Sequence, residues 1–411
     1  MEFFNEYRKM LNTHGLHEKF MTDYIVKEAK DRGYEFADKV ESIQEGSKLI
    51  FAFRSKFVAL VKVGKDLSEG ANVIVSHMDS PRLDVITGNP FVEKEDGVFL
   101  KVIPYGGIIA QSWLDIPLAL VGRVQTEKGI VKINTKGEYD FVITSLLPHL
   151  DGRKEMKELK YEKLLVRIGN NKKENILEVL KEKYGINDGD LELAELSFVP
   201  SANVRELGFD KELISGYGHD DKCCAYAELK AFFDAQESDR SQIALFASYE
   251  ETGSSQITGC KSEIIDDIFL DILGDARKAR MAIRKSRVIS ADVCAAFESN
   301  FASHFEDSAK AVAGKGTAIV PYLGRKAGND SDFVFRNWIK KLAKENDIKY
   351  SIETTKVSEG GGGTVSSFFA TKGCYVIDIG VPVLAMHSPQ EVISKFDLHE
   401  TYRLYKVFLE S

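Results

Sequence analysis

Cysteine is scarce in this sequence, and the few cysteines do not form a metal-binding or disulfide pattern. The 411 residues include five, an odd number without CxxC spacing: Cys223, Cys224, Cys260, Cys294 and Cys374. Cysteine zinc sites and disulfide-rich secreted domains both need regularly spaced cysteines. Both classes are therefore excluded, and we expect these residues to be small, buried, apolar side chains.

Long apolar segments are also missing. The longest, residues 108–120, is interrupted by Gln111, Asp115 and Pro117, whereas a membrane-spanning helix needs about 20 apolar residues. The first fifteen residues mix acidic and basic side chains and lack the apolar core of a signal peptide. We therefore expect a cytoplasmic protein without a membrane partner.

The sequence has no excess of basic residues. Its formal net charge is −8, and the lysines between 154 and 173 are interleaved with Glu and Leu, as on a solvent-exposed helix face. Nucleic acid is therefore not expected as a partner. Hydrophobic residues make up 44% and charged residues 29% of the chain, which is typical of a globular protein, and the length favours two domains.

The order of the predicted elements indicates a domain that carries an insertion. Residues 1–87 contain two amphipathic helices, a hairpin and a short strand that stops before His77. Residues 88–210 consist mainly of short β-rich pieces separated by turns, with one helix near 172–184. Strands and helices alternate again in residues 211–411. The alternation predicts an α/β fold, with a mixed, mainly parallel sheet sandwiched by helices and a largely β insert.

Chemically versatile side chains lie near the ends of the predicted strands. Two histidines and four acids are placed in this way: His77, Asp220, Glu250, Glu251, Asp292 and His387. Because ligands bind outside the carboxyl ends of the strands in open α/β sheets, we expect these side chains to converge. The sequence therefore predicts one site at one edge of the sheet.

The residue types at this edge favour divalent metal ions. Imidazole and carboxylate ligands without thiolates suit zinc, with cobalt or manganese as alternatives. Paired ions about 3.5–4 Å apart, sharing a bridging carboxylate, activate water for hydrolysis. Asp79 follows His77 by two residues, on the same face of the strand, and is suited to orient its imidazole. Glu250, beside the candidate ligand Glu251, is suited to take a proton from water.

Each candidate also has a structural interpretation. His77 alone is more typical of a satisfied, half-buried histidine, Asp220 is equally typical of a helix N-cap, and His387 is equally typical of a surface turn. The adjacent glutamates also fit a solvated acidic turn. The glycine run 360–363 lacks the Lys-Ser or Lys-Thr of a phosphate-binding loop, so we interpret it as a flexible loop that lines the substrate cleft.

Five blocks of the sequence resemble the M18 metallopeptidases, the aspartyl aminopeptidase family. They cover nearly the whole chain in the family's order: SHMDSPRLDV, GHDDKCCAYAEL, SYEETGSSQITG, SADVCAAF and LAMHSPQE. The resemblance implies a metal-dependent aminopeptidase whose substrates are peptides with a free amino terminus. It also implies a catalytic domain split between 1–87 and 211–411, a dimerisation insert at 88–210, and a tetrahedral dodecamer built from dimers.

The resemblance further implies roles for single residues. It assigns the ligands of two divalent ions to His77, Asp220, Glu251, Asp292 and His387, with Asp220 as the bridge. Glu250 would be the general base and Asp79 would orient His77. His149 resembles an insert histidine that reaches towards a neighbouring subunit's site.

The chain departs from the family's pattern at positions associated with substrate. Ala295 and Glu298 stand where the family usually has two histidines, and Ile116 stands where an arginine is common. The family's preference for acidic amino-terminal residues is therefore not carried over. Two further functions use the same ligands: deacylation of N-acylated amino acids, and a non-catalytic metal-binding assembly protein.

Overall fold

The chain forms two compact units. The computed structural model describes residues 2–147, 149, 160–170, 172–322, 330–356, 358–359 and 363–411. Unit 1 comprises residues 1–79, 205–386 and 391–411, and unit 2 comprises residues 80–204 and 387–390. Unit 2 is therefore an insertion in the sequence of unit 1, and it also includes one short segment near the carboxyl end. The assignment of 88–210 as a dimerisation domain stays a prediction.

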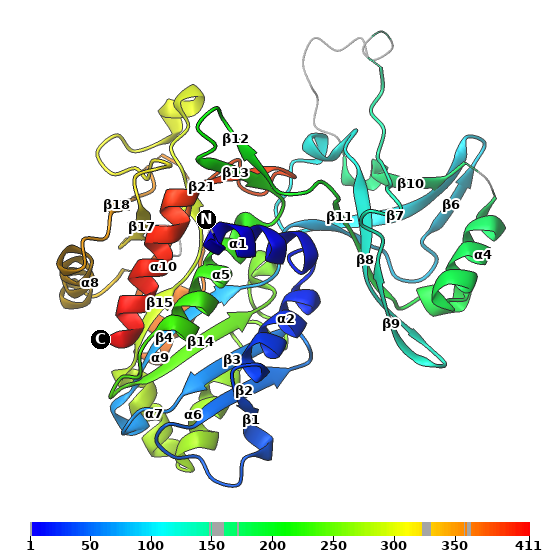
Figure 1. Ribbon diagram of the computed structural model, residues 1–411. Coiled ribbons are helices and arrows are strands. Elements are labelled where there is room, and N and C mark those ends of the chain that lie inside the picture. Colours follow the sequence, from blue (N-terminus) through cyan, green and yellow to red (C-terminus); the bar gives the residue numbers. More distant parts are fainter. Residues whose placement is uncertain are drawn as a thin grey trace. The chain divides into compact units, whose positions relative to one another are not determined.

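A nine-stranded sheet forms the centre of unit 1 (Figure 1). Its four central strands, β14, β4, β15 and β19, are parallel to one another, and the neighbouring strands β3 and β17 run antiparallel to them. In spatial order the strands are β1 (Glu35–Phe36), β2 (Lys48–Phe53), β3 (Phe57–Lys62), β14 (Ser241–Ala247), β4 (Ala71–His77), β15 (Arg287–Ser290), β19 (Tyr375–Gly380), β17 (Thr317–Val320) and β18 (Tyr350–Ile352). The predicted α/β fold is confirmed.

Helices cover both faces of this sheet. On one face, alternate residues of β3, β4 and β14 form an apolar core with α6, α7 and α9. On the other face, α5 and α10 pack against each other and against β4, while α2 packs against β2 and β3 (Figure 1). The helices of unit 1 are α1 (Glu2–Thr13), α2 (Glu18–Lys30), α5 (His219–Asp234), α6 (Ile264–Leu273), α7 (Ala276–Lys285), α8 (Phe333–Glu345), α9 (Ser366–Lys372) and α10 (Lys395–Glu410).

A smaller sheet in unit 1 connects segments that are distant in sequence. Its five strands have the spatial order β12 (Arg205–Leu207), β13 (Leu213–Gly216), β21 (Glu391–Ser394), β20 (Pro382–Leu384) and β16 (Cys294–Ala295). β13 leads into α5, and β16 follows Asp292. The small sheet therefore holds the chain just before Asp220 and just after Asp292.

Unit 2 is built on a seven-stranded sheet in which all the described pairs are antiparallel. Its strands are β5 (Arg82–Val85), β6 (Phe91–Lys94), β7 (Gly97–Tyr105), β8 (Leu118–Thr126), β9 (Gly129–Asn134), β10 (Leu165–Gly169) and β11 (Glu195–Pro200), and it also carries the helix α4 (Lys173–Tyr184). Trp113 is fully buried and packs the interior of this unit. No helix in the described part of the chain has the length and apolar character needed to cross a membrane.

A buried lysine holds the carboxyl end of α5, the helix whose first turn carries Asp220. Lys62, at the end of β3, is 9% exposed, and its Nζ donates to the carbonyl oxygens of Phe232 at 2.6 Å and Ala235 at 2.9 Å. The last carbonyls of a helix have no partner within the helix. Lys62 supplies that partner from the sheet.

We predict that Lys62→Met lowers the free energy of unfolding of unit 1 by about 1–3 kcal/mol, because it leaves two buried carbonyls without their donor. Burial lowers the pKa of Lys62 to about 8, whereas an unfolded lysine titrates near about 10.4. Between these values the unfolded chain binds the additional proton, so the wild type gains stability with rising pH. The destabilisation should therefore be larger at pH 9.5 than at pH 7.

Urea unfolding followed by circular dichroism at both pH values would measure this difference. Lys48→Met is the control, because Lys48 faces Lys62 across the β2–β3 pair but is exposed. Equal unfolding midpoints for Lys62→Met and Lys48→Met would contradict the role of Lys62.

Candidate metal centre

His77 lies at the centre of the predicted site. It is the last residue of β4, one of the central parallel strands, and is 2% exposed. Its Nε2 lies 3.3 Å from Asp220 Oδ1 and 3.6 Å from Asp292 Oδ1. The carboxyl end of β4 therefore brings its own imidazole together with carboxylates from the first turn of α5 and from the segment after β15.

Asp79 contacts both His77 and the loop that carries the two glutamates. The Nδ1 of His77 lies 3.1 Å from the carbonyl oxygen of Asp79 and 3.4 Å from its Oδ1. The Asp79 carboxylate also accepts hydrogen bonds from the backbone N–H groups of Glu250, at 3.3 Å, and Glu251, at 3.2 Å. Asp79 is fully buried, so it links the imidazole firmly to this loop.

The backbone of Asp220 is fixed by a hydrogen bond to a second buried acid. It lies in the first turn of α5, and its N–H donates to Glu391 Oε2 at 3.0 Å. The next residue, Asp221, is joined to it by a cis peptide bond and accepts a hydrogen bond from the backbone N–H of His77 at 3.2 Å. Sequence reasoning missed both Asp221 and Glu391. The doubled acid after His219 was the one available signal.

Glu250, Glu251 and Asp292 complete the cluster. The two glutamates form the start of a single 3-10 turn, Glu250–Thr252, after β14, and Asp292 lies two residues after β15. The ligand atoms of His77, Asp220 and Glu251 lie within 4.8 Å of one another, and so do those of His77, Glu250 and Asp292. Five of the predicted residues thus form two overlapping groups around one histidine.

The two predicted histidines outside this cluster, His149 and His387, belong to unit 2. His387 is half-buried in the segment 387–390, and its Nδ1 lies 2.8 Å from the carbonyl oxygen of Gly107. His149 is exposed, and its sequence neighbours on both sides lie outside the described residues. Residues 360–362 of the glycine run also lie outside them. The roles of these residues stay predictions.

Two of the three positions that depart from the family's pattern, Ala295 and Glu298, lie near Asp292 in the chain. Ala295 is in β16 and is exposed. Glu298 caps the 3-10 segment Ser299–His304, where its carboxylate accepts a hydrogen bond from the N–H of Asn300 at 3.1 Å. A short glutamate engaged in a backbone cap cannot reproduce the donor capacity of a histidine.

The electrostatics of the cluster are dominated by buried acids. Burial, with the nearby Asp292 charge, raises the pKa of Glu250 to about 8. Burial also raises the pKa of Asp292 and, strongly, that of Asp221. For His77 burial alone would lower the pKa, but hydrogen bonds to Asp220, Asp292 and Asp79 raise it well above the usual range.

The directions of these pKa shifts indicate whether the residues are suited to hold metal ions. Acids that are buried together take up protons because their negative charges are not compensated. The only histidine among them is held in its cationic form, which partly replaces the missing positive charge. A cluster of imidazole and carboxylate oxygens with this excess of negative charge fits divalent cations such as zinc.

Comparisons with known proteins agree with this chemistry. The family described as "Aminopeptidase I zinc metalloprotease (M18)" matches residues 17–409. M18 family aminopeptidase 1 of Borrelia garinii subsp. bavariensis is 36% identical, over 99% of this chain and 95% of the relative. The corresponding protein of Clostridium acetobutylicum is 33% identical, over 94% and 90%.

Solved structures give the same result. The M18 aminopeptidase of Thermotoga maritima superposes with a TM-score of 0.94 at 33% identity, covering 100% of this chain and 96% of that chain. The S. cerevisiae mApe1 dodecamer shares the fold at 19% identity, with a TM-score of 0.82 and coverage of 98% and 95%. From its family match and its relatives, the chain belongs to the M18 family of zinc metallo-aminopeptidases.

Proposed function

We propose that this protein releases the amino-terminal residue of peptides at a site that holds two divalent ions. The observation that carries the proposal is the pair of overlapping groups around His77, whose ligand atoms lie within 4.8 Å of one another. Two such groups that share one histidine are better suited to two neighbouring ions than to a single ion. Family membership supports the aminopeptidase and does not support a deacylase or a non-catalytic assembly protein.

The proposed ligands are those that the sequence indicates: His77, Asp220, Glu251, Asp292 and His387. Asp220 is the proposed bridge, because its carboxylate lies beside His77 and belongs to groups that contain Glu251 and Asp292. His387 is included on its place in the block LAMHSPQE. Ions bound by these residues would polarise the scissile carbonyl and lower the pKa of a water molecule.

Glu250 is the proposed general base. It lies beside Glu251 but groups with His77 and Asp292, and it is only partly buried, so it can meet a substrate. In this role its carboxylate takes the proton of the attacking water and passes it to the leaving amine. Asp79 holds both the imidazole and the Glu250 backbone in place, which limits the movement needed during the reaction.

The test of the proposed function is hydrolysis of aminoacyl amides by metal-stripped protein to which zinc, cobalt or manganese is returned. Amides of Asp, Glu, Leu, Lys, Met and Ala cover acidic, basic and apolar residues. We expect metal-dependent release of at least one residue and no cleavage of the corresponding N-acetylated peptide. Cleavage of the acetylated peptide would indicate a deacylase, and silence across the panel with metal bound would overturn the proposal.

We predict that Glu250→Gln lowers kcat by about 10²- to 10⁴-fold, because the amide cannot accept the proton of water. Zinc content should not change, since Glu250 is not a proposed ligand. Glu345→Gln, on the exposed surface of α8, is the matched control and should retain full activity. Near-normal turnover by Glu250→Gln would remove this role from Glu250.

We predict that the affinity of the metal-free protein for zinc rises between pH 6.5 and 8.5. Because the pKa of Glu250 is raised to about 8 and that of His77 well above its usual value, these groups hold protons near neutral pH, and bound ions must displace them. Each displaced proton should increase the affinity about tenfold per pH unit. Competition with a zinc chelator across this range measures the slope, and a pH-independent affinity would contradict the prediction.

We also propose that the protein is a homo-oligomer built from dimers. The mApe1 dodecamer shares its fold, and His149 is exposed, as a contact with another subunit requires. Sedimentation at micromolar concentration should give twelve times the chain mass of 46.0 kDa. A stable monomer would contradict both the oligomer and the contact through His149.

A further inference from the structure

A buried polar cluster lies behind the loop that carries Glu250. We call Glu18, Lys56 and Tyr249 the Lys56 cluster. Lys56 Nζ lies 3.6 Å from Glu18 Oε1 and donates a hydrogen bond of 2.5 Å to the hydroxyl of Tyr249. Lys56 is 7% exposed and Glu18 is 1% exposed. Tyr249 is the residue directly before Glu250, so this cluster reaches the proposed base without taking part in the metal centre.

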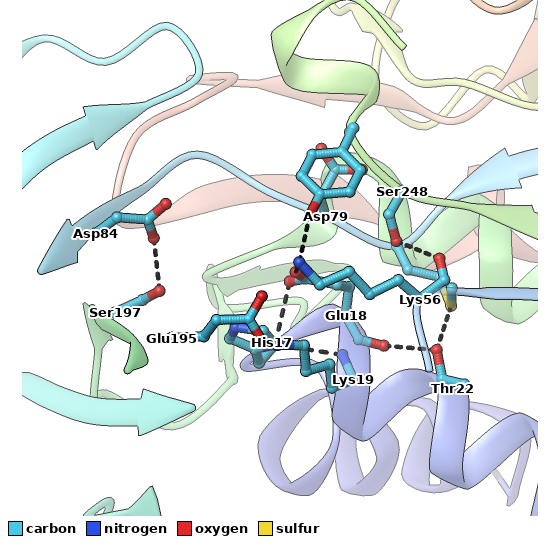
Figure 2. Close-up of polar contacts among 12 residues, drawn as sticks. His17, Glu18, Lys19, Thr22, Lys56, Asp79, Asp84, Glu195, Ser197 and Ser248 are labelled. Carbon is cyan, nitrogen blue, oxygen red and sulfur yellow. Dashed lines mark hydrogen bonds and ion pairs between the residues drawn. The ribbon is translucent and has the colours of Figure 1, made fainter. Parts of the chain in front are cut away.

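Lys56 contacts the loop at two successive residues. Besides the bond from Nζ to Tyr249, its carbonyl oxygen accepts a hydrogen bond of 2.6 Å from Ser248 Oγ, which Figure 2 shows beside the extended Lys56 side chain. The ammonium group also lies 4.6 Å from the centre of the Tyr249 ring. Side chain and backbone of one lysine thus hold the end of β14 and the start of the following turn.

The other end of the cluster is fixed by the first turn of α2. Glu18 is the first residue of this helix, and His17 caps it by accepting a hydrogen bond from the N–H of Lys19 at 3.3 Å. One turn later, Thr22 donates to the carbonyl oxygen of Glu18 at 3.0 Å and lies 3.8 Å from the sulfur of Met78 (Figure 2). The start of α2 therefore supports both segments that lead into the site, before Asp79 and before Glu250.

The backbone at Tyr249 needs such support. Its φ is 64° and its ψ is 20°, a left-handed conformation that is unfavourable for a residue with a side chain. This conformation turns the chain from β14 into the short 3-10 segment and presents Glu250. On one side of the turn, Asp79 accepts hydrogen bonds from the Glu250 and Glu251 amides. On the other side, Lys56 holds the Tyr249 side chain.

Stability alone does not account for the cluster. Replacing a buried ion pair by apolar side chains of similar volume is often neutral or stabilising. An ion pair combined with a directed hydrogen bond, however, fixes an orientation that apolar packing does not. A general base must be placed accurately, and a displacement of about 1 Å at a reacting group can reduce the rate about 10²-fold.

We infer that Glu18 and Lys56 are positioning residues, which act through Tyr249 to hold Glu250 in its reactive place. The inference rests on the proposed function, because it needs Glu250 as the base. It predicts that loss of the cluster slows the chemical step while substrate affinity and metal content are retained.

The experiment compares Lys56→Met and Tyr249→Phe with the wild type in the metal-loaded enzyme. We expect kcat to fall about 10- to 100-fold in Lys56→Met, with KM within about twofold and with unchanged zinc per chain. Tyr249→Phe removes only the hydroxyl, so it should fold normally and lower kcat in the same direction. The double variant should be no slower than Lys56→Met, because both changes break the same contact.

Lys62→Met is the matched control, because Lys62 is a buried lysine at the other end of β3 that bonds to α5. It should lose stability without loss of kcat. Normal kcat in both Lys56→Met and Tyr249→Phe would overturn the inference, as would a fall in kcat that follows loss of zinc. Because Glu250→Gln tests the base by itself, an inactive Glu250→Gln beside fully active cluster variants would refute only the positioning role, whereas an active Glu250→Gln would refute the proposed function.

Discussion

Carboxylates repel one another when they are taken out of water, and unit 1 gathers several of them around a single imidazole. The arrangement at His77 therefore depends on groups that offset this repulsion. Some of the offset comes from the imidazole itself, which carries a proton between Asp220, Asp292 and Asp79. Some comes from backbone N–H groups, which donate to Asp79, Asp221 and Glu391. Divalent ions bound at His77 would replace its additional proton and supply the remaining positive charge, which makes an acid-rich cluster compatible with a stable fold.

The ends of neighbouring strands bring most of the site residues together. β4, β14 and β15 are adjacent and parallel, so the residues that follow them emerge at one edge of the sheet. The small five-stranded sheet positions Asp220, because β13 leads to this residue and β21 begins with Glu391, which accepts a hydrogen bond from the Asp220 N–H. The cluster is therefore held by two sheets, and His77, Asp220, Glu251 and Asp292 come from different pieces of regular structure.

Much of this could be predicted from the sequence. Period and turn signals predicted α1, α2, the β2–β3 hairpin and the alternation after Asp220, because each of these depends on local patterns. The convergence of His77, Asp220, Glu251 and Asp292 followed from one rule about strand ends. Asp79 was expected to orient His77, and the structure adds its bonds to the Glu250 and Glu251 amides.

Other features depend on contacts between distant residues and had no local signal. The five-stranded sheet is made of strands of two to four residues, too short for a recognisable period. α7 is rich in Arg and Lys and buries only Ala279, Ala282 and Ile283, so its apolar face is narrow. Glu18 and Lys56 are typical surface residue types, and nothing in their neighbours indicated burial next to Tyr249.

The order of the strands also has a consequence for synthesis on the ribosome. β4 lies between β14 and β15, yet all of unit 2 except residues 387–390 is made after β4 and before either neighbour. A central strand that is fully buried in the folded protein must therefore wait with both edges unpaired while the insertion is translated. Such an edge readily pairs with other chains. The length of unit 2 thus sets how long the nascent chain exposes the edges of β4 before β14 and β15 can pair with it.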